Sequence, residues 1–148
     1  MISRPTALAT DTMPDIAHET RAQHPAVLDW VGMDQMEMPV TLRLADGRTI
    51  TTPARAAAFV DLADRKERGI HMSRLFLALD EALTGHPLSP ALLAGTLETF
   101  VRRHSGISGA ALIHLDFEVM VRRAALESTE SGWRTYPASV TATLDEVG

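Results

Sequence analysis

The sequence of 148 residues contains no cysteine, few aromatic residues (5%) and more acidic than basic side chains, with a formal net charge of −5. The absence of cysteine excludes a disulfide-linked scaffold and a zinc site built from thiolates of this chain. The acidic balance, with a pI near 5.6, disfavours a nucleic-acid-binding protein, because such proteins carry a basic surface. No apolar run reaches about 18 residues, so no membrane-spanning helix is predicted.

The N-terminal region lacks the apolar stretch of a secretory signal and carries acidic residues instead. We therefore expect a cytoplasmic protein whose length fits one compact domain. Residues 1–28 contain three prolines among polar residues and show no regular period. This composition predicts a flexible N-terminal extension at 1–28, followed by a single folded unit at 29–148.

Two strand-like runs in the first half of the chain are expected to form a hairpin. Within residues 36–44, apolar and polar side chains alternate from Met38 onward, which is typical of a strand with one buried face. Asp46 and Gly47 follow, and an Asp-Gly pair between strands favours a tight turn in which both residues have positive φ. The second run covers residues 48–62. Pro53 within it predicts a bulge or a sheet edge, since proline has no backbone N–H.

The central part of the chain has helical periodicity. A charged loop at 64–69 precedes an amphipathic pattern that stops near residues 84–87. Ser89 and Pro90 then predict the start of a second helix, because serine caps a helix and proline is tolerated at its first position. This second helix is expected to end at residues 105–106. The predicted apolar faces consist of Met72, Leu75, Phe76, Leu79 and Leu83 in the first helix and Leu93, Leu97, Phe100, Val101 and His104 in the second.

Two further strands are predicted at 113–121 and 133–144, where apolar and polar residues again alternate. The polar face of the first of them is expected to be open to water or to a partner. The order strand-strand-helix-helix-strand-strand predicts an α+β fold, with an antiparallel four-stranded sheet and two helices on one face. The last strand would form an unprotected edge, which predicts oligomerisation through sheet edges.

The six histidines invite a metal-site hypothesis, but their spacing argues against it. No His-x-His or His-x-x-x-His pair occurs, and only His114 and Asp116 are placed to point the same way from one strand. Such a pair on an open strand face is typical of a solvated cross-strand network. The sequence also contains no Gly-x-Ser-x-Gly elbow, P-loop or Gly-x-Gly-x-x-Gly motif, so the common hydrolase and nucleotide-binding motifs are absent.

The segment at residues 68–74 is the strongest candidate for a binding site. His71, Ser73 and Arg74 fall at the start of the first predicted helix. Free backbone N–H groups, a hydroxyl and a guanidinium at a helix N-terminus favour an anion-binding site. In the alternative interpretation, His71 and Ser73 only cap the helix and Arg74 forms a surface ion pair.

Residues 69–74, Gly-Ile-His-Met-Ser-Arg, resemble the G-[TI]-H-M-S-R signature of type IB GTP cyclohydrolase I, an enzyme family of folate biosynthesis. Further segments are similar to that family in the same order, across about residues 13–144. The ordered set is much more specific than the six-residue signature alone. The other matching segments are residues 13–16, 31–32, 38–40, 115–123, 132–133 and 136–137.

The resemblance implies a tunnelling fold, in which ββααββ units join side by side into a barrel in a homo-oligomer. It also implies the metal-assisted hydrolysis of GTP to formate and 7,8-dihydroneopterin triphosphate, the first step of tetrahydrofolate biosynthesis. Zinc or manganese would be the cofactor, supplying a nucleophilic water. The implied partner is GTP, with no nucleic acid and no membrane. From this resemblance His71, Ser73 and Arg74 become expected substrate-binding or interface residues, and the contact of Arg74 with the triphosphate is our inference.

Members of that family carry two such units, and their metal ligands and purine-anchoring glutamate lie in the second one. No residue of this chain therefore receives a catalytic or metal-binding role. Three hypotheses follow. In the first, the chain is an N-terminal half that is inactive alone, and the end of the sequence directly after a strand favours this hypothesis. In the second, it is a free-standing subunit that either binds a purine or pterin or assembles with a partner. In the third, it is an interaction domain that shares only the fold, against which the intact His-Met-Ser-Arg segment argues.

Overall fold

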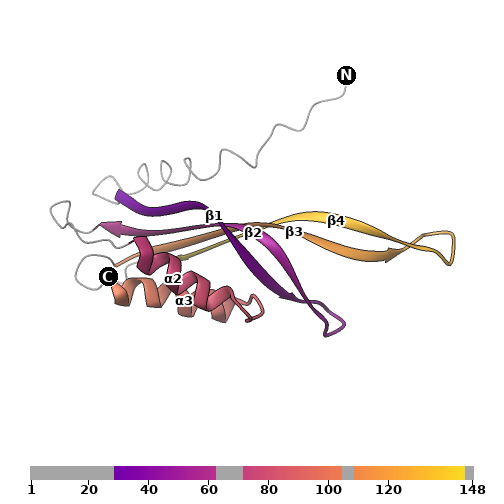
Figure 1. Ribbon diagram of the computed structural model, residues 1–148, viewed down its shortest axis with the longest axis horizontal. Coiled ribbons are helices and arrows are strands. Elements are labelled where there is room, and N and C mark those ends of the chain that lie inside the picture. The colour runs from indigo at the N-terminus through magenta and orange to yellow at the C-terminus, as the bar shows by residue number, and fades with distance from the viewer. Residues whose placement is uncertain (1–28, 63–71, 105–108, 146–148) are drawn as a thin grey trace, which may run out of the picture.

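The computed structural model describes residues 29–62, 72–104 and 109–145, which form two β-hairpins with a pair of helices between them in the chain (Figure 1). The predicted extension at 1–28, the charged loop at 64–69 and the predicted helix end at 105–106 lie outside these residues. In chain order the elements are β1 (Asp29–Arg43), β2 (Thr49–Leu62), α2 (Met72–Leu83), α3 (Pro90–Arg103), β3 (Ala111–Ala124) and β4 (Ser131–Leu144).

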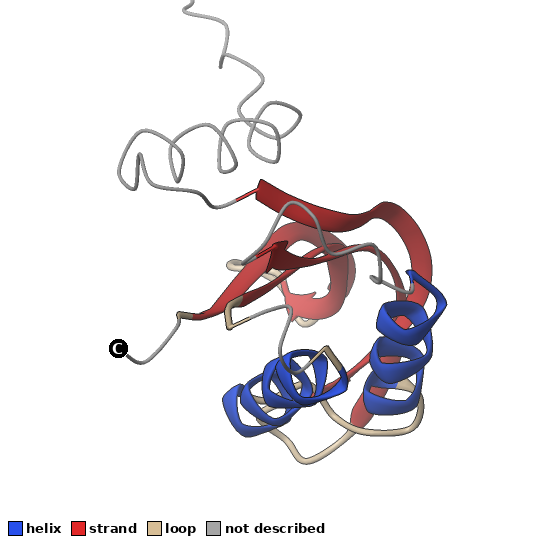
Figure 2. Ribbon diagram, turned by 90° about the vertical axis from the view of Figure 1, so that its left-hand side faces the viewer, coloured by secondary structure: helices blue, strands red, loops and turns tan. Residues whose placement is uncertain are grey.

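The four strands form one antiparallel sheet in the order β1-β2-β3-β4. Both helices lie on one face of it, with α2 against β1 and β2 and α3 against β3 and β4 (Figure 2). This arrangement confirms the predicted α+β unit with the order ββααββ. Within the described ranges, no helix is long and apolar enough to cross a membrane.

The hydrophobic core fills the layer between the sheet and the helices, because every second strand residue faces the helices. The predicted apolar face of α2 is confirmed at Leu75, Leu79 and Leu83, which are buried. Phe76 was expected in this face but is 37% exposed, and Ala78 is buried in its place. The stripe formed by residues 75, 78, 79 and 83 leaves Phe76 at its border, and a small residue at 78 lets the helix approach the sheet.

The strand β1 begins seven residues before the segment in which its alternation was recognised, and its irregularity lies in that early part. The register with β2 shifts between Met33 and Met36, where β1 contains one extra residue. Within this bulge Gln35 has a φ of 55°, a conformation that residues other than glycine rarely adopt. The bulge expected at Pro53 is therefore wrong. The alternative prediction of an edge holds locally, because β2 pairs with β3 only from Ala54 onward.

The predicted hairpin between β1 and β2 is confirmed, but its turn is longer than a two-residue Asp-Gly turn. Leu44 N–H donates to the Arg48 carbonyl at 2.7 Å, and Gly47 N–H donates to the Leu44 carbonyl at 3.0 Å. Only Gly47, with a φ of 86°, has positive φ in this turn, so its conformation is a three-residue loop ending in a left-handed glycine. Hydrogen bonds from the backbone and side chain of Arg48 hold the pKa of the Asp46 carboxyl below its ordinary value.

The start of α3 agrees with its prediction. Ser89 is the N-cap, in an extended conformation, and its Oγ accepts a hydrogen bond from the Leu92 N–H at 3.1 Å. At the other end His104 is only 2% exposed. Its Nδ1 lies 2.9 Å from the Phe100 carbonyl oxygen, which also accepts a hydrogen bond from the His104 backbone N–H at 3.2 Å.

The substitution Ser89→Ala is expected to lower the free energy of unfolding by about 1 kcal/mol, because it removes the acceptor of an otherwise free N–H group. Ser89→Gly should cost only a few tenths of a kcal/mol. Urea denaturation followed by circular dichroism measures both. Thr99→Ala on the same helix is the control and should leave the midpoint nearly unchanged. An equal effect of Ser89→Ala and Thr99→Ala would contradict the capping role.

The third strand departs from its predicted half-exposed pattern. Residues 111–115 are buried on both faces, and alternation between buried and exposed residues begins only at Asp116. His114, expected on the water-facing side, is 6% exposed. The strand β4 lies at the edge of the sheet, as predicted, and is largely exposed.

Candidate functional site

The first turn of α2 carries two of the three expected substrate-binding residues, while His71 lies outside the described residues. Ser73 and Arg74 are both exposed there. Neither side chain forms a hydrogen bond or an ion pair with another residue of the described part of the chain, so the alternative in which Arg74 forms a surface ion pair finds no partner there. The structure thus brings a hydroxyl and a guanidinium to the same helix start, beside N–H groups that lack intrahelical partners.

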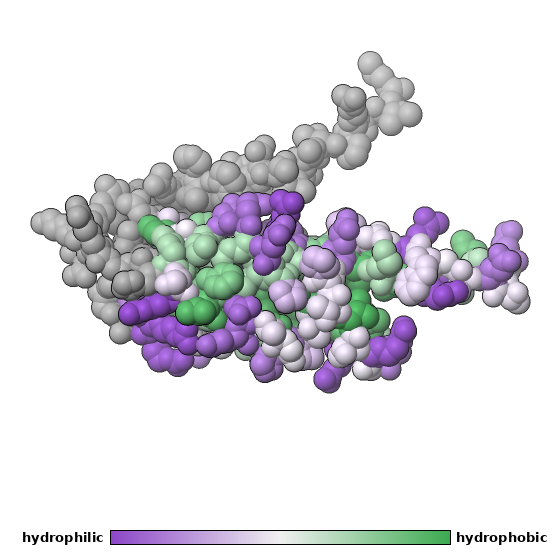
Figure 3. All heavy atoms as spheres, in the orientation of Figure 1, coloured by the Kyte–Doolittle hydropathy of each residue, from purple (hydrophilic) through white to green (hydrophobic). Residues whose placement is uncertain are grey.

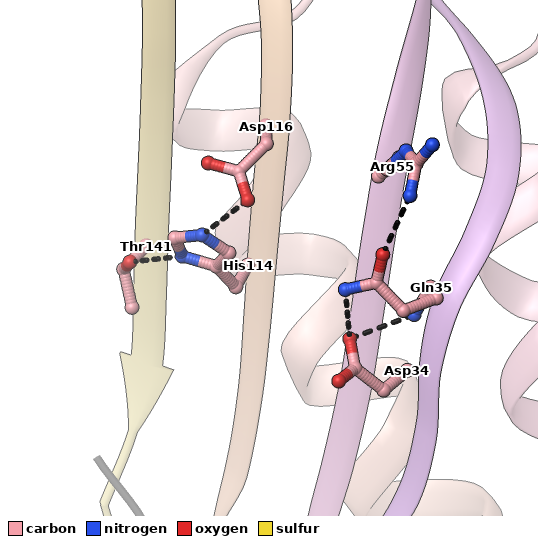
Figure 4. Close-up of polar contacts among 6 residues, drawn as sticks. All are labelled: Asp34, Gln35, Arg55, His114, Asp116 and Thr141. Atoms are coloured by element: carbon pink, nitrogen blue, oxygen red, sulfur yellow. Dashed lines mark hydrogen bonds and ion pairs between the residues drawn. The ribbon is translucent and has the colours of Figure 1, made fainter. Parts of the chain in front are cut away.

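A polar network lies on the sheet face opposite the helices (Figure 4). The Nδ1 atom of His114 is 2.6 Å from Thr141 Oγ1 on the neighbouring strand β4. Its Nε2 atom is 3.1 Å from Asp116 Oδ2, an ion-pair distance at which the N–H direction does not meet hydrogen-bond geometry. The predicted cross-strand network is therefore confirmed, but the histidine is buried rather than solvated. The ring is held between a hydroxyl and a carboxylate.

A second polar network joins the bulge in β1 to Arg55 on the neighbouring strand β2. Arg55 Nη1 donates to Gln35 Oε1 at 3.0 Å. The Gln35 backbone N–H and side-chain Nε2 both donate to Asp34 Oδ1, at 2.7 and 3.2 Å. These bonds hold the amide of Gln35 and, through it, the guanidinium of Arg55 (Figure 4). No carboxylate within the described ranges forms an ion pair with Arg55.

A cleft opens where β2 and β3 part, and we call it the fork. The two strands pair up to Ala54 and Phe117, and beyond these residues β2 continues beside β1 while β3 continues beside β4. Thr52 Oγ1 donates to the Glu118 carbonyl oxygen at 2.8 Å where the strands separate. The fork has a volume of ≈ 1120 Å³ and is open to solvent. Its lining includes Glu37, Pro39, Pro53, Arg55, Asp116, Phe117 and Glu118.

The charges in the fork are mixed, with three carboxylates and the guanidinium of Arg55. Within the described ranges no group of three or more His, Cys, Asp or Glu side chains could hold a metal ion. The zinc or manganese that the resemblance implies therefore does not fit the residues described here. The polar face can donate and accept hydrogen bonds, but it offers no ligand set on which a metal-dependent step could be placed.

Sequence patterns missed Gln35, Arg55 and Thr141, which complete the two networks. A single arginine inside the apolar run at 54–60 was a usable signal, because a lone charge there needs a polar partner or solvent. The other two had no signal. Gln35 lies in a bulge, and Thr141 lies opposite His114 in the strand register. Both features depend on pairing between segments that are distant in the sequence.

Comparison with known proteins gives relatives along most of the chain. It is 42% identical over 134 residues to a protein of Pseudoalteromonas translucida named GTP cyclohydrolase FolE2, covering 90% of this chain and 44% of that protein. A protein of Bdellovibrio bacteriovorus with the same name is 42% identical over 141 residues, covering 95% of this chain and 46% of that protein. The chain thus spans less than half the length of these curated relatives.

Residues 13–148 also match the family model described as type I GTP cyclohydrolase folE2. The matched range includes all four strands and both helices that the structure describes. The chain therefore belongs to the type I GTP cyclohydrolase FolE2 family.

Proposed function

We propose that this chain contributes one of two tunnelling-fold units to a GTP cyclohydrolase that hydrolyses GTP to formate and 7,8-dihydroneopterin triphosphate. The observation that carries the proposal is the identity of 42% to proteins named GTP cyclohydrolase FolE2. In this proposal residues 29–148 are the folded unit and residues 1–28 an extension. The 148 residues correspond to less than half of each relative, and they are inactive by themselves.

The reaction opens the imidazole ring of GTP with a nucleophilic water, and a bound metal ion would supply that water at neutral pH. Because no described group of side chains here could hold the ion, we place no metal-dependent step on these residues. The role proposed for this chain is substrate binding. His71, Ser73 and Arg74 would hold the triphosphate at the start of α2, where backbone N–H groups and a guanidinium both favour negative charge.

The binding role predicts that Arg74→Ala weakens GTP binding by the 148-residue protein about tenfold or more, because a charge-assisted hydrogen bond contributes roughly 1.5–3 kcal/mol. Isothermal titration calorimetry with GTP measures the change. Guanosine, which lacks the phosphates, should bind Arg74→Ala and the unaltered protein equally. Arg102→Ala, at an exposed position near the end of α3, is the matched control. If Arg74→Ala and Arg102→Ala bind GTP equally well, the proposed triphosphate contact is wrong.

A free-standing subunit that binds a purine or pterin without catalysis remains the competing proposal, and the same titration addresses it. A chain that binds guanosine or a pterin tightly while Arg74→Ala has no effect would favour that alternative. Assembly through sheet edges belongs to either proposal, because β4 presents unpaired backbone groups along one side.

A further inference from the structure

The polar network around His114 joins three groups of different chemistry on the sheet face opposite the helices (Figure 4). Thr141 Oγ1 lies 2.6 Å from His114 Nδ1, and Asp116 Oδ2 lies 3.1 Å from the other ring nitrogen, Nε2. The imidazole is therefore placed between a hydroxyl on β4 and a carboxylate on its own strand, β3. A hydroxyl within hydrogen-bond reach of a base that a third group orients is the arrangement of an activated nucleophile.

The proton of the neutral imidazole belongs on Nε2 in this arrangement. A lone pair on Nε2 would face the negative charge of Asp116 Oδ2 at 3.1 Å, whereas an N–H there is attracted to that charge even though its direction is not that of a hydrogen bond. Nδ1 is then the acceptor, because a neutral imidazole carries one donor and one acceptor nitrogen. The O–H of Thr141 donates to Nδ1 at 2.6 Å, so its proton already points at a base.

The charge of Asp116 is available to the histidine. Arg55 lies opposite Asp116 in the register of β2 and β3, but its guanidinium donates to Gln35 and forms no ion pair with a carboxylate of the described residues. His114 is 6% exposed, so water screens its interaction with the carboxylate only weakly. The same carboxylate stabilises the imidazolium that forms when the ring takes up a proton.

The hydroxyl, unlike the imidazole, is open to solvent. Thr141 is exposed on β4, the edge strand of the described sheet. Asp116 lies shortly before the part of β3 that projects with β4 beyond the rest of the described protein, residues 118–137 (Figures 1 and 3). Because no strand of the described ranges pairs with the outer side of β4, alternate backbone N–H groups around Thr141 have no strand partner there. Such donors are what a developing oxyanion requires.

The contact with histidine is specific to one of the threonines on this face of β4. Thr143 is also exposed but lies opposite the apolar Leu112, and Thr135 lies opposite Met120. The strands β3 and β4 pair along their whole length through their backbones, so the ladder itself does not require a histidine at residue 114. Burying a polar ring there has a cost that an apolar side chain would avoid.

We propose that Thr141 is a nucleophile that accepts the acyl group of an activated ester, with His114 as its general base and Asp116 as a positioning residue. Thr141 Oγ1 forms a bond to the acyl carbon while its proton passes to His114 Nδ1. The bond from the acyl carbon to the leaving-group oxygen then breaks, and His114 returns the proton to that oxygen. The products are an acyl ester of Thr141 and a free alcohol or phenol, so atoms and charge balance without a further reactant. This site shares no residue with the proposed binding site for GTP.

Acetylation of the 148-residue protein by p-nitrophenyl acetate tests this assignment. The chain has no cysteine and a single lysine, Lys66, so few other nucleophiles compete. Tandem mass spectrometry of its peptides should place an acetyl group on Thr141. Thr141→Val should abolish this product and leave the acetylation of Lys66 and of the N-terminus unchanged. Thr143→Val alters an exposed threonine of the same strand and face, and as the control it should leave the acetylation of Thr141 unchanged.

Two further substitutions separate general-base catalysis from a structural role, and circular dichroism shows that each variant is folded. His114→Gln should slow the acetylation of Thr141 about a hundredfold, at the lower end of general acid–base effects. Asp116→Asn, at a more exposed position that does not endanger the fold, should slow it about tenfold or more. Asp116→Glu keeps the charge and should restore part of the rate. Equal acetylation of Thr141 and Thr143 in the unaltered protein would overturn the proposal, and so would a rate at Thr141 that folded His114→Gln or Asp116→Asn leaves unchanged.

Discussion

Incubated with GTP and Zn²⁺ or Mn²⁺, the 148-residue chain is expected to release no formate above the rate of a protein-free control. The sequence has no cysteine, and no described cluster of three His, Asp or Glu side chains could bind the metal ion. A hydrolytic enzyme accelerates its reaction by at least about 10⁶-fold, so losing the metal-activated water abolishes measurable turnover. The measurement is formate release over several hours at neutral pH.

The full-length FolE2 protein of Pseudoalteromonas translucida, assayed under the same conditions, is the positive control for this experiment. Circular dichroism of the 148-residue chain shows whether it is folded during the assay, so that inactivity can be separated from unfolding. Formate released by a folded, metal-loaded sample of this chain at a rate proportional to its concentration would show that the proposed inactivity is wrong.

The substitution Gly32→Ala should reduce the free energy of unfolding by about 3 kcal/mol or more, at the upper end of the usual cost of overpacking. A Cβ atom added at residue 32 would overlap the backbone oxygen of Ala58 and would lie 2.7 Å from the Cα of Phe59. Because both contacts are to backbone, no side-chain rotation relieves them, and the β1–β2 ladder itself must shift. The midpoint of urea denaturation, followed by circular dichroism, measures the loss.

Gly132→Ala is the matched control, since residue 132 also lies in a strand but a Cβ there meets nothing within 4 Å. This substitution should be neutral or slightly stabilising, because alanine loses less conformational freedom on folding than glycine. If Gly32→Ala is as stable as Gly132→Ala, the close approach of β1 to β2 at Gly32 does not exist in solution.

Local signals predicted the elements well where the structure depends on neighbouring residues. The serine and proline at 89 and 90 indicated the start of α3 because capping involves only groups within one turn. The Asp-Gly pair indicated the first hairpin, although the turn type was wrong. That error has a physical reason, because a three-residue loop with one left-handed glycine and a two-residue turn contain the same pair, and strand register selects between them.

The Gly-Ile-His-Met-Ser-Arg signature before and at the start of α2 was likewise recognised from consecutive residues. The tertiary structure adds that Ser73 and Arg74 are exposed and without partners among the described residues, which a sequence pattern cannot show. In the same way the alternation of β3 predicted that His114 and Asp116 share a face. It could not predict that His114 is buried, because burial of that face depends on what packs there in three dimensions.

The sequence by itself determined the order of elements, the hairpins, the helix starts and the family, since each of these follows from residues close together in the chain or from segments in a fixed order. Only the tertiary structure decided the bulge at Gln35, the hydrogen-bond partners of His114 and Arg55, and the fork where β2 leaves β3. These features arise from strand register and sheet twist, which bring together residues from segments far apart in the sequence. A periodic pattern within one segment carries no information about which residues of distant segments come into contact.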